Sequence, residues 1–278
     1  MPTTVRTYER DAIGRFARSC RLQTGWQLLK IRNLRWLWAG QTISQIGDGL
    51  NKVALLYLVY NLTGSTLKMT IIGVLQTLPP LFLGPVLGVY VDRFPKKRIM
   101  ISVDVLRSGL ALVIPVLYAM DLLTLTWLYP VVFVMAIVAT AFGPALSAVV
   151  PQIVEPSQLT AANALVTSTA MIGMLIGPAI SGLGIATVGM QVVLYVSSGT
   201  FLLSVLSLSQ LKVKPDQSSA KKAENHKSFT EAFKAGLHYV LVERRTIAAF
   251  VLTALCYSLA SSAFIFLLPV FAEKVLHA

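Results

Sequence analysis

Long stretches of this chain contain no charged residue, and they constrain its fold more than any other feature. Residues 122–154 hold no Asp, Glu, Lys or Arg, and neither do residues 156–211. A run of about 18 or more apolar residues is typical of a helix that crosses a bilayer. Charged residues make up only 13% of the chain, against about a quarter in a soluble domain. The sequence therefore predicts an all-α, polytopic membrane protein.

Seven membrane spans are predicted from the apolar stretches. They are residues 36–60, 69–91, 99–120, 123–144, 163–186, 190–210 and 247–271. Each is long enough to cross a hydrocarbon core about 30 Å thick. Gly-Pro steps occur in the second and fifth spans, at 84–85 and 177–178. Because these spans run in opposite directions, the steps fit a three-plus-three inverted repeat of spans 1–3 and 4–6.

The basic residues gather in three segments that fall on one side of such a topology. The tail (1–35), the link between spans 2 and 3, and the segment 211–246 hold eight, four and eight of the 24 Lys and Arg residues. This bias predicts a cytoplasmic amino terminus. The basic segments then face the anionic inner leaflet of the bilayer. The net charge of +12 therefore indicates contact with the membrane surface rather than binding of nucleic acid.

Four domains follow from this organisation. We predict a basic cytoplasmic tail (1–35), a six-helix transmembrane bundle (36–210), a cytoplasmic central loop (211–246) and a seventh span with the end of the chain (247–278). Ser228 and Glu231 form a Ser-x-x-Glu capping box, which predicts an amphipathic helix in the central loop.

The first span carries a polar stripe at mid-membrane depth. Its members are Gln41, Gln45, Asp48 and Lys52, with Ser44 and Asn51 beside them. Ionisable residues at this depth usually face a bundle interior or an aqueous cavity. The stripe is thus a candidate transport pathway with a proton-coupling group. Asp48 and Lys52 also have the spacing to pair, and a neutralised pair that only stabilises the bundle is the alternative.

Two further motifs are candidates for structural or gating roles. Asp104 and Arg107, at i and i+3 in the third span, form a second candidate ion pair, from which Arg107 could reach the cytoplasmic surface. Gly173, Gly177, Pro178 and Gly182 lie in the fifth span. The glycines allow close helix contact and the proline can bend the helix, so tight packing and a gating bend both remain open.

No enzyme constellation accompanies these motifs. The three histidines lie at positions 226, 238 and 277, without a nucleophile elbow, paired carboxylates or a phosphate-binding glycine loop. We therefore expect no enzyme activity, no cofactor and no metal.

The link "GVYVDRFPKKR" (88–98) resembles the signature between the second and third helices of the major facilitator superfamily. Gly88, Asp92, Arg93, Lys96 and Lys97 match that signature, and Pro95 replaces its usual glycine. The resemblance implies a cytoplasmic gate at these residues. It also implies the six-helix amino-terminal half of a major facilitator fold, followed by one further transmembrane helix.

Other segments extend the resemblance. "GMLIGPAISG" (173–182) is similar to the fifth-helix motif of proton-coupled antiporters, and "VVPQIVEPSQLTAANAL" (149–165) looks like the branch with macrolide-efflux and enterobactin-exporter proteins. The resemblance implies a bacterial plasma-membrane transporter that exports small hydrophobic compounds (drug, macrolide-like or siderophore-like) by alternating access. Protons are the expected coupling ion, with Asp48 as the coupling group.

The length of the chain conflicts with that activity. The family builds its pathway from about twelve spans, and seven are predicted here. We therefore expect a truncated form whose missing half or partner chain is required. The alternative is a transport-inactive membrane fragment or a subunit that needs a partner.

Overall fold

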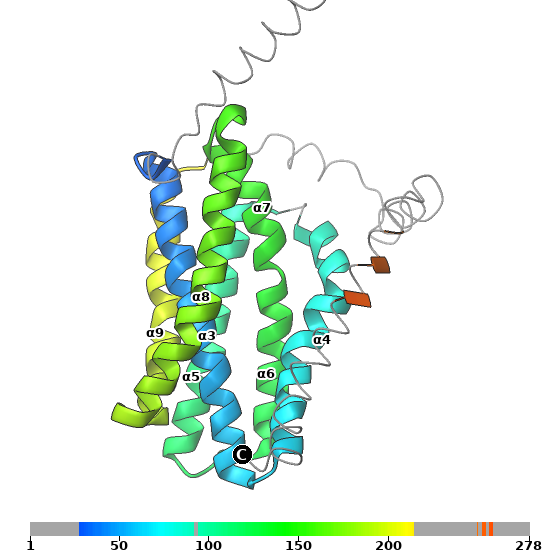
Figure 1. The fold of residues 1–278 in the computed structure, drawn as a ribbon, viewed down its shortest axis with the longest axis vertical. Helices are drawn as coiled ribbons and strands as arrows, with labels where there is room; N and C mark the ends of the chain where they lie inside the picture. The colour runs from blue at the N-terminus through cyan, green and yellow to red at the C-terminus, as the bar shows by residue number, and fades with distance from the viewer. Residues whose placement is uncertain (1–27, 92–93, 214–248, 250–251, 254–255, 258–278) are drawn as a thin grey trace, which may run out of the picture.

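The computed structural model describes residues 28–91, 94–213, 249, 252–253 and 256–257. This part of the chain is almost entirely helical and contains no strand. Figure 1 shows the long helices side by side in one bundle. Their bounds are α3 (Arg32–Thr63), α4 (Thr66–Val91), α5 (Lys96–Ala119), α6 (Leu125–Thr140), α7 (Phe142–Ile153), the short 3₁₀ helix η1 (Pro156–Gln158), α8 (Leu159–Val188) and α9 (Met190–Ser209).

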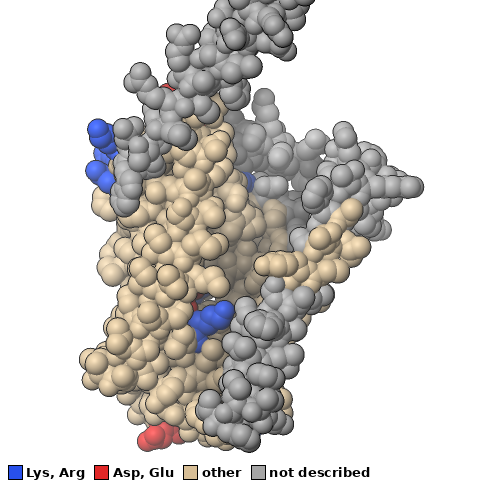
Figure 2. Space-filling model, in the orientation of Figure 1, with Lys and Arg blue, Asp and Glu red and all other residues tan. Residues whose placement is uncertain are grey.

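Five segments within the described residues are long and apolar enough to cross a membrane, and uncharged residues cover most of the described surface seen in Figure 2. The segments are Thr66–Gly84, Lys96–Ala119, Leu125–Ile153, Pro156–Val188 and Met190–Ser209. The first predicted span, 36–60, lies within α3, whose 32 residues exceed the length required. The polar stripe lowers the mean hydropathy of α3. For this reason α3 is not among the five segments chosen by length and hydropathy.

The fourth predicted span differs from the structure. One helix was expected over 123–144, but α6 ends at Thr140 and α7 continues from Phe142 to Ile153. Pro144 has no N–H to donate to the carbonyl of residue 140, so the hydrogen-bond ladder is interrupted there. The chain stays uncharged to Val154, and the two helices together make one 29-residue segment that can span a membrane.

Helix α3 lies between α8 and α9, and glycines let it approach both (Figure 1). A Cβ added at Gly49 would lie 2.6 Å from the Cα of Gly177 on α8. On the α9 side, a Cβ at Gly40 would lie 3.2 Å from the Cβ of Ser207. Small residues at these positions therefore determine how closely the three helices pack.

Apolar clusters fill the two ends of the bundle. One cluster includes Leu34, Leu37, Met100, Val149 and Leu208, and the other includes Leu55, Leu58, Ile114, Leu128 and Leu194. Buried polar side chains from α3, α5 and α9 lie between these clusters along the helices. The molecule thus has apolar ends and a polar layer at mid-depth.

Side chains from separate segments cross-link one end of the bundle. Asn33 at the start of α3 donates to the carbonyl of Lys212 (2.8 Å) and accepts from its backbone N–H (3.2 Å). Lys97 at the start of α5 donates to the carbonyls of Ser209 (2.7 Å) and Leu211 (2.6 Å). The beginnings of α3 and α5 and the end of α9 therefore meet at the same end of the molecule.

Candidate transport-pathway site

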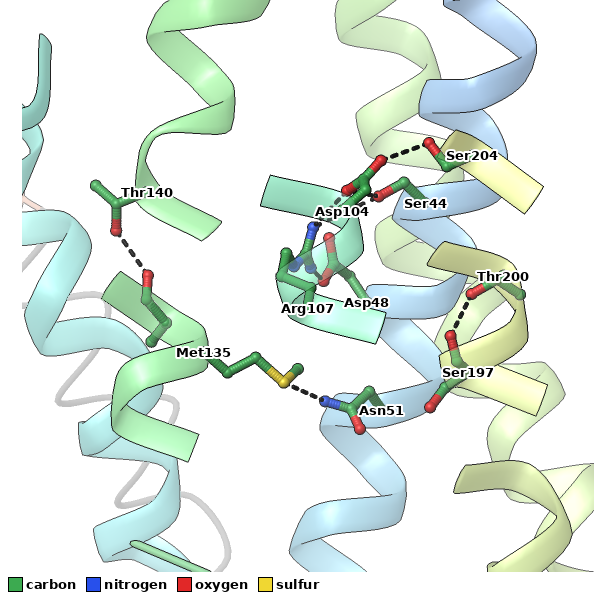
Figure 3. A network of polar contacts seen from close by, with 11 residues as sticks. Ser44, Asp48, Asn51, Asp104, Arg107, Met135, Thr140, Ser197, Thr200 and Ser204 are labelled. Carbon is green, nitrogen blue, oxygen red and sulfur yellow. Dashed lines mark hydrogen bonds and ion pairs between the residues drawn. The ribbon is translucent and has the colours of Figure 1, made fainter. Parts of the chain in front are cut away.

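The polar layer is built around one face of α3. Ser44, Asp48 and Asn51 lie at helical spacing on this face, and each contacts a residue of α5 or α6 (Figure 3). Ser44 and Asn51 are 2% and 3% exposed, and the side chain of Asp48 is 38% exposed. The face is therefore mostly buried, and Asp48 is the point at which it opens.

Arg107 of α5 connects two carboxylates. Its guanidinium forms an ion pair with Asp48 of α3 and lies 3.6 Å from the Asp104 carboxylate, one turn away on α5 (Figure 3). The guanidinium carbon also lies 4.3 Å from the ring centre of Phe201 on α9, within cation–π distance. Arg107 is only 3% exposed, and its guanidinium contacts residues of α3, α5 and α9.

Asp104 has no exposed surface and is satisfied from two other helices. Ser204 of α9 donates to one carboxylate oxygen at 2.6 Å, and Ser44 of α3 donates to the other at 3.3 Å. Ser44 also accepts from Arg107 at 3.4 Å. The two aspartates and Arg107 therefore form one network, the triad, which carries one net negative charge when all three groups are ionised.

The alternative pairing of Asp48 with Lys52 is wrong, and so is the prediction that Arg107 reaches the cytoplasmic surface. Asp48 pairs with Arg107 rather than with Lys52, and Arg107 points into the bundle rather than toward the membrane surface. Both differences have one cause, because a buried guanidinium requires a counter-charge, and Asp48 and Asp104 supply it.

The other stripe residues have separate surroundings. Asn51 donates to the sulfur of Met135 on α6 at 3.8 Å, and its Oδ1 has no hydrogen-bond partner among the described residues. Gln41 is 2% exposed, and its Oε1 is likewise unpaired within this part of the chain. Gln45 instead lies against α8, where a Cβ added at Gly173 would be 2.6 Å from its Cβ. Asn51 therefore lies on the side of the stripe that faces α5 and α6, and Gln45 lies on the side that contacts α8.

Serines on α9 were missed in the sequence. Besides Ser204, Ser198 exchanges hydrogen bonds with Ser108 of α5, at 2.8 Å to the Ser108 carbonyl and 3.0 Å in the opposite direction. Ser207 donates to the carbonyl of Trp36 at 2.8 Å. The signal was present in the sequence, because serines recur at one- and two-turn spacing in an otherwise apolar span and polar side chains hold membrane helices together.

Part of the predicted gate motif lies outside the described residues, namely Asp92 and Arg93. Lys96 is buried and donates to the carbonyls of Val91 (3.1 Å) and Phe94 (3.2 Å), and Lys97 holds the end of α9 as described above. A Cβ at Gly88 would meet nothing within 4 Å. The two lysines therefore hold backbone carbonyls at this end of the bundle.

The residues of the antiporter-like motif also differ in their surroundings. Gly173 and Gly177 contact α3, and a Cβ at Gly49 would lie 2.9 Å from the ring of Pro178. Ser181, one turn further along, donates to the carbonyl of Leu50 at 3.0 Å. Gly182 has open space around it. Gly173, Gly177 and Pro178 therefore take part in the α3–α8 contact.

Most of the seventh predicted span, and the amphipathic helix of the central loop, lie outside the described residues. Of the polar positions in that span, Thr253 donates to the carbonyl of Ala249 at 2.8 Å, and Tyr257 is 74% exposed.

Apolar helices around a buried charge network define an integral, multi-pass membrane protein. Residues 23–278 match the family described as transmembrane secretion effector. The chain belongs to this family, which is of the major facilitator superfamily type. Its members are membrane transporters and not enzymes, so the family confirms the resemblance seen in the sequence.

Bacterial efflux proteins are among its relatives. Macrolide efflux protein A of Streptococcus pyogenes is 32% identical over 149 residues, which is 53% of this chain and 36% of the relative. The multidrug efflux pump Tap of Mycobacterium tuberculosis is 30% identical over 176 residues, 60% of this chain and 41% of the pump. The MFS-type transporter YfiS of Bacillus subtilis is 30% identical over 214 residues, 75% of this chain and 49% of the relative. The chain therefore spans about half or less of the length of these relatives.

Proposed function

We propose that this chain takes part in secondary active export of small hydrophobic compounds across a bacterial plasma membrane, driven by proton antiport. Relatives named for macrolide and multidrug efflux support the export of such compounds. The charge network that Arg107 forms with Asp48 and Asp104 inside the bundle carries the proposal. Transport by alternating access requires a second bundle that moves against this one, and a partner chain or further sequence would supply it.

Asp48 is the proposed proton-coupling group. A net negative charge is costly at mid-membrane depth, and one proton makes the triad neutral. Asp104 has no exposed surface, whereas the side chain of Asp48 is 38% exposed and has a route for proton exchange. When Asp48 is protonated its attraction to Arg107 weakens, and Arg107 is left to Asp104. A switch of partner between α3 and α5 gives two states that a proton and a substrate could each bias.

The test is retention of a radiolabelled macrolide in bacterial cells that express this chain together with the further sequence or partner chain that supplies the second bundle. Wild type should lower retention relative to an empty vector, and a protonophore should restore it. Asp48→Asn should retain the compound at the vector level with or without the protonophore. Asp121→Asn is the matched control, because Asp121 lies outside the triad in the link between α5 and α6, with a φ of 55° that Asn tolerates.

Two results would contradict the proposal in different ways. If the wild-type chain with its second bundle does not lower retention, the proposed export is wrong. If Asp48→Asn exports normally and stays sensitive to the protonophore, export stands and the assignment of Asp48 is wrong.

A further inference from the structure

Lys52 is a cation at mid-depth in the bundle that has no partner among the described residues. At 1.5 Å per residue it lies roughly 30 Å from the start of α3 and about 17 Å from its end. It is exposed, and no hydrogen bond or ion pair involves it within the described part of the chain. An unpaired charge at such depth faces water or a ligand rather than lipid.

The exposure of α3 places Lys52 in a local opening. At about 100° per residue, Gln41, Asp48, Lys52 and Val59 lie in one narrow sector of the helix. Gln41 and Val59, at the two ends of the sector, are 2% and 0% exposed, whereas Asp48 and Lys52 between them reach the surface. We call the opening at Asp48 and Lys52 the mid-depth recess.

The flanks of this sector are already occupied by helix contacts. Gln45 and Gly49, on one side, pack against α8. Ser44 and Asn51, on the other side, bond to α5 and α6. The mid-depth recess therefore opens between two packed walls.

The ion pair already formed by Asp48 favours an anion over a cation as the ligand of the recess. To bind a cation, Asp48 would have to share or give up its ion pair with Arg107. To bind an anion, Lys52 would break no ion pair or hydrogen bond with the described residues. A hydrogen bond to a charged group inside a partly desolvated site contributes more than one at the surface.

We infer that Lys52 binds an anionic group, a carboxylate, on the compounds that enter the mid-depth recess. The ligand class is an amphiphile with an apolar body and one carboxylate. The inference rests on the proposed function and adds amphiphiles with one carboxylate to its substrates, beside the macrolides used to test export. It assigns specificity to Lys52 and leaves proton coupling to Asp48.

The test measures binding of three fluorescent probes to the chain purified in an uncharged detergent. The probes are pyrenebutyrate, pyrenebutanol and pyrenebutylamine, which share a ring system and differ in charge. Wild type should bind pyrenebutyrate about tenfold tighter than pyrenebutanol, the effect of one charge-assisted contact. Lys52→Gln should remove that preference, and Lys52→Arg should keep most of it.

Lys68→Gln is the matched control, because Lys68 is exposed in the first turn of α4 and outside the recess. It should leave the preference unchanged. A preference for pyrenebutylamine, an equal affinity for all three probes, no binding of any probe, or a preference that survives Lys52→Gln would each overturn the inference. Binding is measured without a gradient, so macrolide export that depends on Asp48 can stand or fail independently of it.

Discussion

Arg107 is the residue on which the polar layer depends. A guanidinium stays charged in proteins, so it cannot relieve its burial by losing a proton. Its position is instead stabilised by two carboxylates and by the ring of Phe201. Its Nε has no hydrogen-bond partner among the residues described, so one N–H donor of the guanidinium is not used by these contacts.

Removal of this one side chain should destabilise the bundle. Arg107→Gln leaves Asp48 and Asp104 near each other without a counter-charge, and breaking a buried pair typically costs about 3 kcal/mol or more. Because Asp48 is partly exposed, we expect a loss at the lower end of that range. The measurement is the unfolding temperature in detergent.

Arg98→Gln on the same helix is the control for Arg107→Gln, since Arg98 is exposed. The combined variant Asp48→Asn with Arg107→Gln should recover part of the lost stability, because it restores a triad with less unbalanced charge. If Arg107→Gln unfolds at the wild-type temperature, the triad does not stabilise the fold.

At the scale of elements, the contact between α3 and α8 is a backbone contact. Without side chains at Gly49 and Gly177, the helices approach until the main chains touch, and Ser181 then reaches the carbonyl of Leu50. Dispersion and interhelical hydrogen bonds drive such packing where the solvent is itself apolar. The order of α3 between α8 and α9 therefore depends on residues that have little or no side chain.

Alanine substitutions at Gly49 and Gly182 should separate the effect of the close helix contact on stability from the effect of helix propensity. Gly49→Ala should lower the unfolding temperature, because its Cβ would lie 2.6 Å from the Cα of Gly177 and backbone cannot move aside cheaply. Gly182→Ala, where the space is open, should be neutral or slightly stabilising, since Ala favours a helix by roughly 1 kcal/mol over Gly. Equal unfolding temperatures for the two variants would show that the close contact does not limit packing.

At the scale of the molecule, the basic segments of the described residues meet at one end. The beginnings of α3 and α5 and the residues after α9 are tied together by Asn33 and Lys97. The link between α5 and α6, with Asp121, joins the opposite ends of those helices. We propose that the basic end is cytoplasmic, following the positive-inside bias.

This orientation predicts opposite labelling of the two ends in intact cells. In a chain with Cys20 and Cys256 replaced by Ser, a membrane-impermeant maleimide should label Asp121→Cys and spare Arg98→Cys. Permeabilised cells should label both positions, which controls for accessibility. Labelling of Arg98→Cys alone in intact cells would reverse the proposed orientation.

Much of the architecture could be predicted because it depends on local properties of the chain. Five of the first six predicted spans each fall on a single described helix to within a residue, and the fourth covers α6 and the start of α7. This agreement arises because the lengths of uncharged runs are set by the thickness of a bilayer. The polar stripe was visible because helical spacing brings residues three and four apart onto one face. The break between α6 and α7 was missed although Pro144 signals it, because hydropathy alone does not report hydrogen bonding.

The sequence by itself determined that this chain is a polytopic helical membrane protein with charges at mid-depth and a basic end. Only the tertiary structure decided that Asp48 pairs with Arg107 and not Lys52, that serines of α9 complete the network, and which glycines meet backbone. Hydropathy, charge and helical spacing are properties of neighbouring residues, so one chain displays them. The partner of a buried charge depends on which helices cross and at what height, and those helices are distant in sequence.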